Sequence, residues 1–247
     1  MSAGTLYTFK GSGNSYKVRL LEALLGIQLE HKELDFLADE QHSSEFLAVN
    51  PRGEVPCRVD GDKTFNDSSS ILTWLAGKWG DGGKSQGPSS FWSNHLYEQA
   101  QIINWLAFAN SWVQYGVFTN RAILSYNGPY NGLGNNQQWP QEKLDVSLEE
   151  GALRGNQSLE ILDKQLQTNE WLVLRRPTIA DISFFVYISL AEMGDISLEP
   201  FENVRKWIER IKGLEGFFAI EGLDDPLLHL ERWKGAGRER PLNVGKS

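Results

Sequence analysis

The chain has little cysteine: Cys57 is the single one in 247 residues. One cysteine excludes an intramolecular disulfide and any CxxC redox pair, and it agrees with a reducing compartment. The N-terminus also lacks the basic start and long apolar run of a signal peptide. We therefore expect a cytoplasmic protein.

Long apolar runs and basic clusters are also missing. The longest apolar stretch, 184–191, is far shorter than the roughly 20 residues that cross a membrane. The 24 Lys and Arg are outnumbered by 32 Asp and Glu, which disfavours a general nucleic-acid binder because phosphate affinity comes from clustered basic residues. The four histidines lack metal-ligand spacing. We expect no nucleic acid, membrane or metal among the partners.

The chain is long enough for one large or two modest domains, and 40% of its residues are hydrophobic, which suffices for a core. Residues 81–90 are rich in helix and strand breakers and contain no core-forming residue. We therefore predict a linker there, between a domain at 1–80 and a second domain at 91–247.

Strand and helix signals alternate in the first domain. The expected order is a strand at 5–10, a helix through 18–25, an edge strand within 29–36, a short helix at 43–49, a hairpin over 55–59 and 63–66, and a helix from Ser68. A βαβ unit followed by ββα predicts a small α/β domain.

The second domain shows helical periodicity wherever the signal is strong. The expected elements are a long helix at 92–124, a surface loop at 126–140, and three helices that cover 159–166, follow Pro177, and span 204–211. This domain is predicted to be all-α.

The stretch 11–20 joins the first strand to the first helix. It offers two glycines for a sharp turn, with Ser12, Asn14 and Ser15 as candidate caps; Ser15 is favoured as the N-cap. The free amides of a first helical turn also form a site for an anion. From these residues alone, a plain capped turn and an anion site both stay open.

Four motifs in order resemble the cytosolic glutathione transferases of the serine type. They are the turn 12–19, the segment 50–56 that ends in Val55-Pro56, the helix start 66–72, and Pro177-Thr178-Ile179-Ala180-Asp181. The resemblance implies a thioredoxin-like domain (βαβαββα), an all-α helical bundle domain, a cis proline at Pro56, and a capping box of Thr178 and Asp181. It also implies a homodimer, with glutathione as co-substrate and no metal.

By this resemblance, Ser12 donates a hydrogen bond that stabilises the glutathione thiolate. Ser15 is the second candidate donor. Asn14 is the third, because some relatives place an asparagine near the sulfur. The alternative for Ser12 is a purely structural role in the turn.

The resemblance also implies how the rest of glutathione is held. Asp67 accepts from the γ-glutamyl amine and Ser68 binds its carboxylate, although an ordinary helix cap is a compatible role for both. The other implied contacts are the Val55 backbone held by Pro56, Glu54 within the same motif, and Arg52 and His42 at the glycyl carboxylate, with a solvated loop as the alternative for His42.

The hydrophobic electrophile is expected on the first helices of the second domain, with Trp112 and Tyr115 lining its pocket. Aromatic stripes on helices are, however, more often plain core. We predict a detoxifying glutathione S-transferase. Two alternatives stay open: a peroxidase, lyase or isomerase that uses the same thiolate, and a non-catalytic binding module. The loop 126–140 and the tail 223–247 receive no assigned role.

Overall fold

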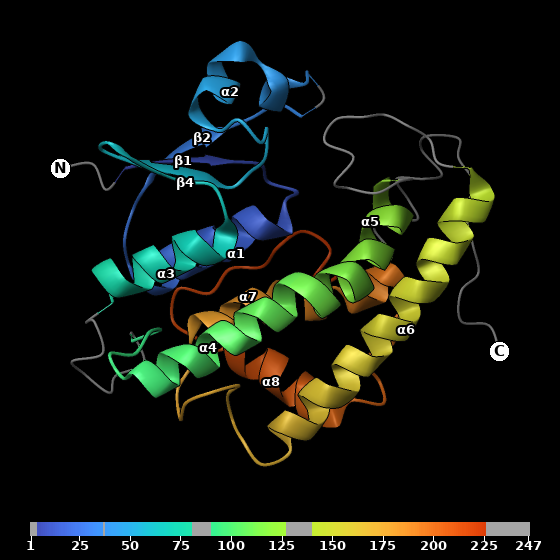
Figure 1. Cartoon of the computed structure of the whole chain (residues 1–247). Helices are drawn as coiled ribbons and strands as arrows, with labels where there is room; N and C mark the ends of the chain where they lie inside the picture. The colour runs from blue at the N-terminus through green and yellow to red at the C-terminus, as the bar shows by residue number, and fades with distance from the viewer. Residues whose placement is uncertain (1–3, 37, 81–89, 127–139, 226–247) are drawn as a thin grey trace.

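A computed structural model describes residues 4–36, 38–80, 90–126 and 140–225. It shows a sheet-containing unit above a larger helical unit (Figure 1). The predicted linker, apart from Ser90, the centre of the predicted loop and the tail beyond residue 225 lie outside the described residues.

The sheet contains four strands in the order β2-β1-β3-β4. They are β1 (Thr5–Thr8), β2 (Glu30–Glu33), β3 (Cys57–Asp60) and β4 (Lys63–Phe65). β1 pairs parallel with β2 and antiparallel with β3, and β3 forms a hairpin with β4. This confirms the predicted thioredoxin-like arrangement, including the position of the second strand at the sheet edge.

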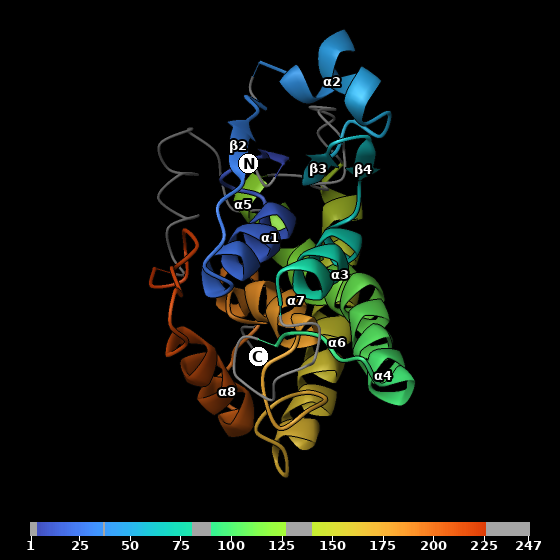
Figure 2. The same cartoon turned by 90° about the vertical axis from the view of Figure 1, so that its left-hand side faces the viewer.

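Two helices separate the sheet from the helical unit. α1 (Gly13–Leu24) and α3 (Ser68–Lys78) lie side by side beneath the sheet and above α7 (Figure 2). The short elements η1 (Glu40–His42) and α2 (Ser44–Val49) lie beyond the strands. The N-termini of α1 and α3 are therefore held close to the boundary between the two units.

The second unit is all-α, as predicted. Its elements are α4 (Leu96–Phe108), the π-helical segment η2 (Ala109–Phe118), α5 (Thr119–Tyr126), α6 (Gln141–Leu166), α7 (Ile179–Ile188), the 3₁₀ turn η4 (Ala191–Gly194) and α8 (Glu202–Lys212). The helix predicted at 92–124 starts instead at Leu96, because Ser93 and His95 form a non-helical turn before it, and it continues through the π segment.

α7 is the centre of this unit, because all ten of its residues are buried. Its start has the predicted capping box: Thr178 Oγ1 accepts from Ala180 N at 3.2 Å, and Asp181 Oδ2 accepts from Thr178 N at 2.8 Å. Asp181 also accepts from Trp207 Nε1 at 3.0 Å, which ties α7 to α8. The box thus fixes the helix against which the sheet unit packs.

Candidate functional site

The turn between β1 and α1 is capped by Ser12. Its backbone is extended (φ −76°, ψ 118°), and its Oγ accepts a hydrogen bond from Ser15 N at 3.1 Å. The expectation that Ser15 is the N-cap is therefore wrong: Ser15 lies inside the first turn, is fully buried, and its hydroxyl bonds to no described residue. Ser12 keeps its own hydroxyl hydrogen for a further acceptor.

Asn14 joins three elements. Its Oδ1 accepts from Ser68 Oγ at 3.3 Å, at the start of α3, and from the Tyr187 hydroxyl at 2.7 Å, on α7. Asn14, predicted near the sulfur, and Ser68, predicted at the γ-glutamyl carboxylate, are thus in direct contact. Asn14 is half-buried, and its Nδ2 donates to none of the residues that the structure describes.

The start of α3 is a capped helix terminus. Asp67 Oδ1 accepts from Ser69 N at 2.8 Å and from Ser70 N at 3.2 Å. Asp67 is exposed, whereas Ser68 is buried. The predicted capping role is confirmed, and both of these bonds go to the same carboxylate oxygen.

The loop before β3 has a fixed shape. The Val55-Pro56 peptide bond is cis, as expected. Asn50 closes the loop, because its Nδ2 donates to Glu54 O at 2.7 Å and its Oδ1 accepts from Arg52 N at 3.1 Å. The arrangement leaves Arg52 exposed and places Val55 two residues before the inner strand β3.

His42 lies against this loop. A Cβ added to Gly53, which has φ of +62°, would lie 2.9 Å from His42 Cδ2. His42 is oriented by Asp39, whose Oδ1 is 2.6 Å from His42 Nδ1. The loop that carries Arg52 therefore lies against His42, the other residue predicted for the glycyl carboxylate.

Two buried cations stand close to the turn, and the sequence alone assigns neither of them a role at the sulfur. Lys17 of α1 is fully buried, with its Nζ 4.1 Å from the centre of the Tyr187 ring. Burial lowers the pKa of Lys17 to about 7, opposed by the charge of Asp67. Arg121 of α5 is 4% exposed, and its Nη1 lies 3.7 Å from where a Cβ on Gly13 would be.

The aromatic residues of α4 and η2 divide into two groups. Trp105 and Phe108 pack on Phe184 of α7, with ring centres 5.3 and 5.8 Å apart, so they belong to the core. Trp112 and Tyr115 are 39% and 55% exposed. Together with Tyr97 at the start of α4, which is 76% exposed, they are the most exposed aromatic side chains of these two elements.

The described residues do not support a cysteine nucleophile or a metal centre. Burial raises the pKa of the Cys57 thiol to about 11, and its Sγ donates to Asn66 Oδ1 at 3.3 Å, so it is a poor nucleophile. Within the described ranges no group of His, Cys, Asp and Glu is placed to hold a metal ion. The same ranges contain no helix that is long and apolar enough to cross a membrane.

Comparison with known families gives two matches. The glutathione S-transferase N-terminal domain matches residues 6–82, and the glutathione S-transferase C-terminal domain matches residues 138–215. The chain belongs to the glutathione S-transferase family.

Individual relatives are distant. The chain is 27% identical over 230 residues to protein URE2 of Candida albicans, an alignment that covers 84% of this chain and 66% of that protein. A crystal structure of a glutathione S-transferase from Pseudomonas fluorescens has a TM-score of 0.75 and 27% identity, over 89% of this chain and all of that one. A structure of Ure2p in complex with glutathione has a TM-score of 0.70, over 92% and 94% of the chains; at 22% identity it shows the fold alone.

Proposed function

We propose that this protein is a glutathione transferase. It binds glutathione across the N-termini of α1 and α3, stabilises the sulfur as a thiolate, and directs it to a hydrophobic electrophile. One observation carries the proposal: Ser68 Oγ and Asn14 Oδ1 are 3.3 Å apart, so the two helix starts converge on one small region. Each start presents free backbone amides and the positive end of a helix dipole to an anion.

Activation of the thiol requires a modest energy. A free thiol has a pKa near 8.5, and lowering it by about two units takes roughly 2.7 kcal/mol of differential stabilisation. Hydrogen bonds to a charged acceptor contribute about 1.5–3 kcal/mol each. Ser12, the first candidate donor, has a free hydroxyl hydrogen, and Asn14 has a free amide; the buried hydroxyl of Ser15 is the weakest candidate of the three.

The remaining contacts are assigned to the start of α3, the loop before β3 and η1. Asp67 and the Ser68 amide hold the γ-glutamyl group, the Val55 backbone beside cis Pro56 pairs with the cysteinyl unit, and Arg52 with His42 binds the glycyl carboxylate. Glu54, whose backbone oxygen accepts from Asn50 Nδ2, belongs to the same loop as Arg52 and Val55. We place the electrophile next to Trp112 and Tyr115.

The test is conjugation of glutathione to a generic haloaromatic substrate. We expect Ser12→Ala to lower kcat/KM by about tenfold to a hundredfold, with Asn14→Ala as the comparison, because each loses one donor to a charged sulfur. Equal turnover by the wild type and both variants would remove the turn from the mechanism. Peroxide, disulfide and isomerisation assays on the same preparations distinguish the alternative enzyme activities.

A second candidate is a non-catalytic glutathione-binding module. The similarity to URE2 proteins favours this candidate. The name URE2 does not denote a transferase, whereas the name of the Pseudomonas fluorescens protein does. Calorimetry separates the two: binding of glutathione without turnover of any substrate in the panel supports the module. Absence of binding would overturn both candidates.

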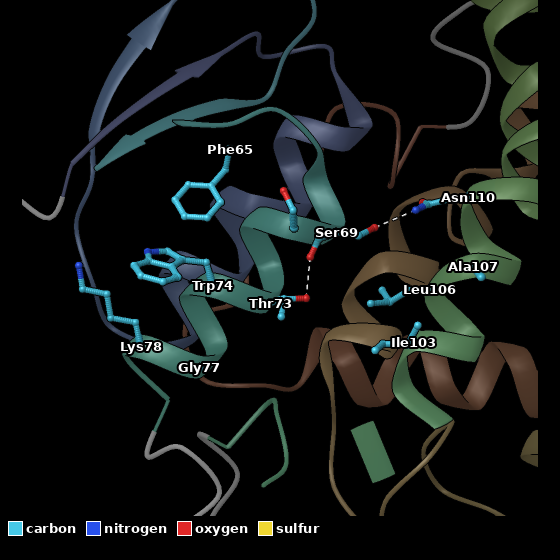
Figure 3. Close-up of a pocket in the computed structure, with 11 residues that line it drawn as sticks. Phe65, Ser69, Thr73, Trp74, Gly77, Lys78, Ile103, Leu106, Ala107 and Asn110 are labelled. Atoms are coloured by element: carbon cyan, nitrogen blue, oxygen red, sulfur yellow. Dashed lines mark hydrogen bonds between the residues drawn. The ribbon is translucent and has the colours of Figure 1, made fainter. Parts of the chain in front are cut away.

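We also propose a homodimer that uses a groove between α3 and α4. This groove, of about 840 Å³, is formed by Phe65 and Trp74 of the sheet unit and Ile103, Leu106 and Ala107 of the helical unit (Figure 3). Ile103 is 54% exposed there. Dimerisation through this groove would bury an apolar face that water otherwise contacts.

The dimer is tested by light scattering. We expect Ile103→Asp to halve the measured mass, whereas Ile161→Asp, at a 49% exposed apolar residue of α6 outside the groove, leaves it unchanged. A monomeric wild type would contradict the proposal.

We also propose domain boundaries at residues 80 and 91 and a cytoplasmic location.

A further inference from the structure

Asn14 is held in one orientation by residues from two other helices. Its amide is planar, so fixing Oδ1 with the Ser68 and Tyr187 hydroxyls also fixes the opposite end, Nδ2. Nδ2 donates to no described residue, so it is both fixed in direction and available to donate a hydrogen bond to a ligand. A hydrogen bond received by the oxygen of an amide also strengthens the donors on its nitrogen.

Tyr187 itself is firmly placed. It is 1% exposed in the fully buried helix α7, and its ring lies 5.1 Å from the ring of Phe118. Its hydroxyl reaches across the boundary between the two units to a residue 173 positions earlier in the chain. The orientation of Asn14 is thus determined by the helical unit as well as by the turn.

Lys17 brings a charge to the same place. Its side chain is fully buried and stacks on the Tyr187 ring, and its Nζ bonds to none of the described residues. A buried charge without a partner lowers the stability of a fold, typically by several kcal/mol. Such a residue is tolerated where an anion joins it in the functional state.

The charged groups near Lys17 include one carboxylate that acts on it and one further cation. Asp67, at the start of α3, is the carboxylate whose charge acts on it. On α1 itself, Glu22 bonds to Leu29 N and His31, and Arg19 bonds to Lys10 O. From α5, the Arg121 guanidinium adds a second positive charge beside Gly13.

We propose that Tyr187 and Lys17 are positioning residues of the sulfur site: Tyr187 orients and polarises the amide of Asn14 toward the thiolate, and Lys17 supplies a buried positive charge behind it. The inference rests on the proposed function and adds to it. Neither residue touches the sulfur. Both act through Asn14 and through the field at the turn.

The readout is the pKa of glutathione's thiol when bound, followed by the ultraviolet absorbance of the thiolate from about pH 5 to about pH 9. We expect Tyr187→Phe and Lys17→Met each to raise this pKa by about 0.5–1 unit, a threefold to tenfold loss of thiolate below it. The KM for glutathione should change by less than about twofold. Lys17→Met should also leave the thermal midpoint unchanged or raise it, which a merely structural lysine would not do.

Tyr16→Phe is the matched control. Tyr16 is a second buried tyrosine, on α1, whose hydroxyl donates to Phe218 O at 2.6 Å. Removing that hydroxyl should lower stability without shifting the bound thiol's pKa. The inference is overturned if Tyr187→Phe and Lys17→Met leave that pKa at the wild-type value, or if Tyr16→Phe shifts it equally. If the wild-type protein binds no glutathione in calorimetry, the proposed function falls as well.

Discussion

At the scale of single residues, the turn carries two buried groups with opposite effects on folding. Ser12 satisfies a helix amide that would otherwise lack a partner, which stabilises the fold. Lys17 brings a charge into the core without a hydrogen-bond acceptor among the described residues, which destabilises it. The site therefore combines a locally favourable turn with a locally unfavourable cation.

Lys17→Met should stabilise the protein in a pH-dependent way. The pKa of Lys17 is about 7 in the folded chain and 10.5 in the unfolded chain, so between these values the unfolded chain binds more protons. The free energy of unfolding then rises with pH across this window, and below about pH 7 the full penalty, on the order of 5 kcal/mol, is present. The variant should gain most near pH 6 and little near pH 10.

Urea unfolding at several pH values measures this gain. Lys63→Met, at a lysine whose side chain is 57% exposed, serves as the control and should show no such pH dependence. A Lys17→Met gain that is the same at every pH, or a loss, would contradict the expectation.

Ser12→Ala should reduce both stability and activity, and a second serine separates the two effects. Ser93 is equally buried, and its Oγ accepts from His95 N at 3.1 Å, the same distance as Ser12 Oγ to Ser15 N. Ser93 Oγ also donates to Glu98 Oε2, so Ser93→Ala should lose at least as much stability as Ser12→Ala. Loss of either acceptor should lower the free energy of unfolding by about 1 kcal/mol. Only Ser12→Ala should reduce conjugation; an equal loss in Ser93→Ala would attribute the effect to stability.

The sequence indicates some of these residues and not others. Short motifs point to Ser12, Asn14 and Ser68, because their roles depend on local turn chemistry. Lys17 lies three and four residues before Leu20 and Leu21, so helical spacing already places it on the apolar stripe. Tyr187 has no local signal, because its role arises from a contact across 173 positions.

At the scale of elements, η2 and α6 approach one another at glycines. A Cβ on Gly116 would lie 2.7 Å from the backbone nitrogen of Gly155, closer than two such atoms can come. Side chains larger than hydrogen at this contact would push the two helices apart. The position of η2, which carries Trp112, therefore depends on Gly116.

Gly116→Ala should destabilise the protein by about 2–3 kcal/mol, because backbone atoms cannot move aside as a side chain can. Gly77→Ala is the matched substitution in α3, where a Cβ meets nothing within 4 Å. It should stabilise by about 0.5–1 kcal/mol through helix propensity. Thermal unfolding compares the two, and similar midpoints would contradict this account.

The sequence predicts most elements because their apolar positions repeat with a clear period. It does not reveal the π segment, in which the backbone amide of Thr119 donates to Gln114 O, five residues back. Aromatic spacing over ten residues does not separate a π-helix from an α-helix. Nor does the sequence show that α6 begins at Gln141, since polar residues dominate its first turns.

At the scale of the whole molecule, the two units share one core. A single cluster of buried apolar residues runs from Leu6 in β1 through α7 to Ile211 in α8. Polar bonds also cross the boundary, since Asn110 Nδ2 donates to Ser69 Oγ at 2.8 Å. Neither unit buries its apolar face alone.

We therefore expect thermal unfolding in one transition. Far-ultraviolet circular dichroism and tryptophan fluorescence should give coincident curves, and the calorimetric and van't Hoff enthalpies should agree within about 10–20%. Two separate transitions would show that the shared core does not couple the units.

The hydrogen bond from Tyr187 to Asn14 has a further consequence. Because a 2.7 Å bond is lost when its partners separate by about an ångström, a small tilt of α7 relative to α1 would weaken the donor at the turn. In the proposed enzyme, the pKa of the bound thiol would therefore depend on how the two units are docked. An electrophile that pushes the helical unit away from the sheet unit would raise the pKa of the bound thiol and lower the fraction present as thiolate. An electrophile that draws the two units together would have the opposite effect.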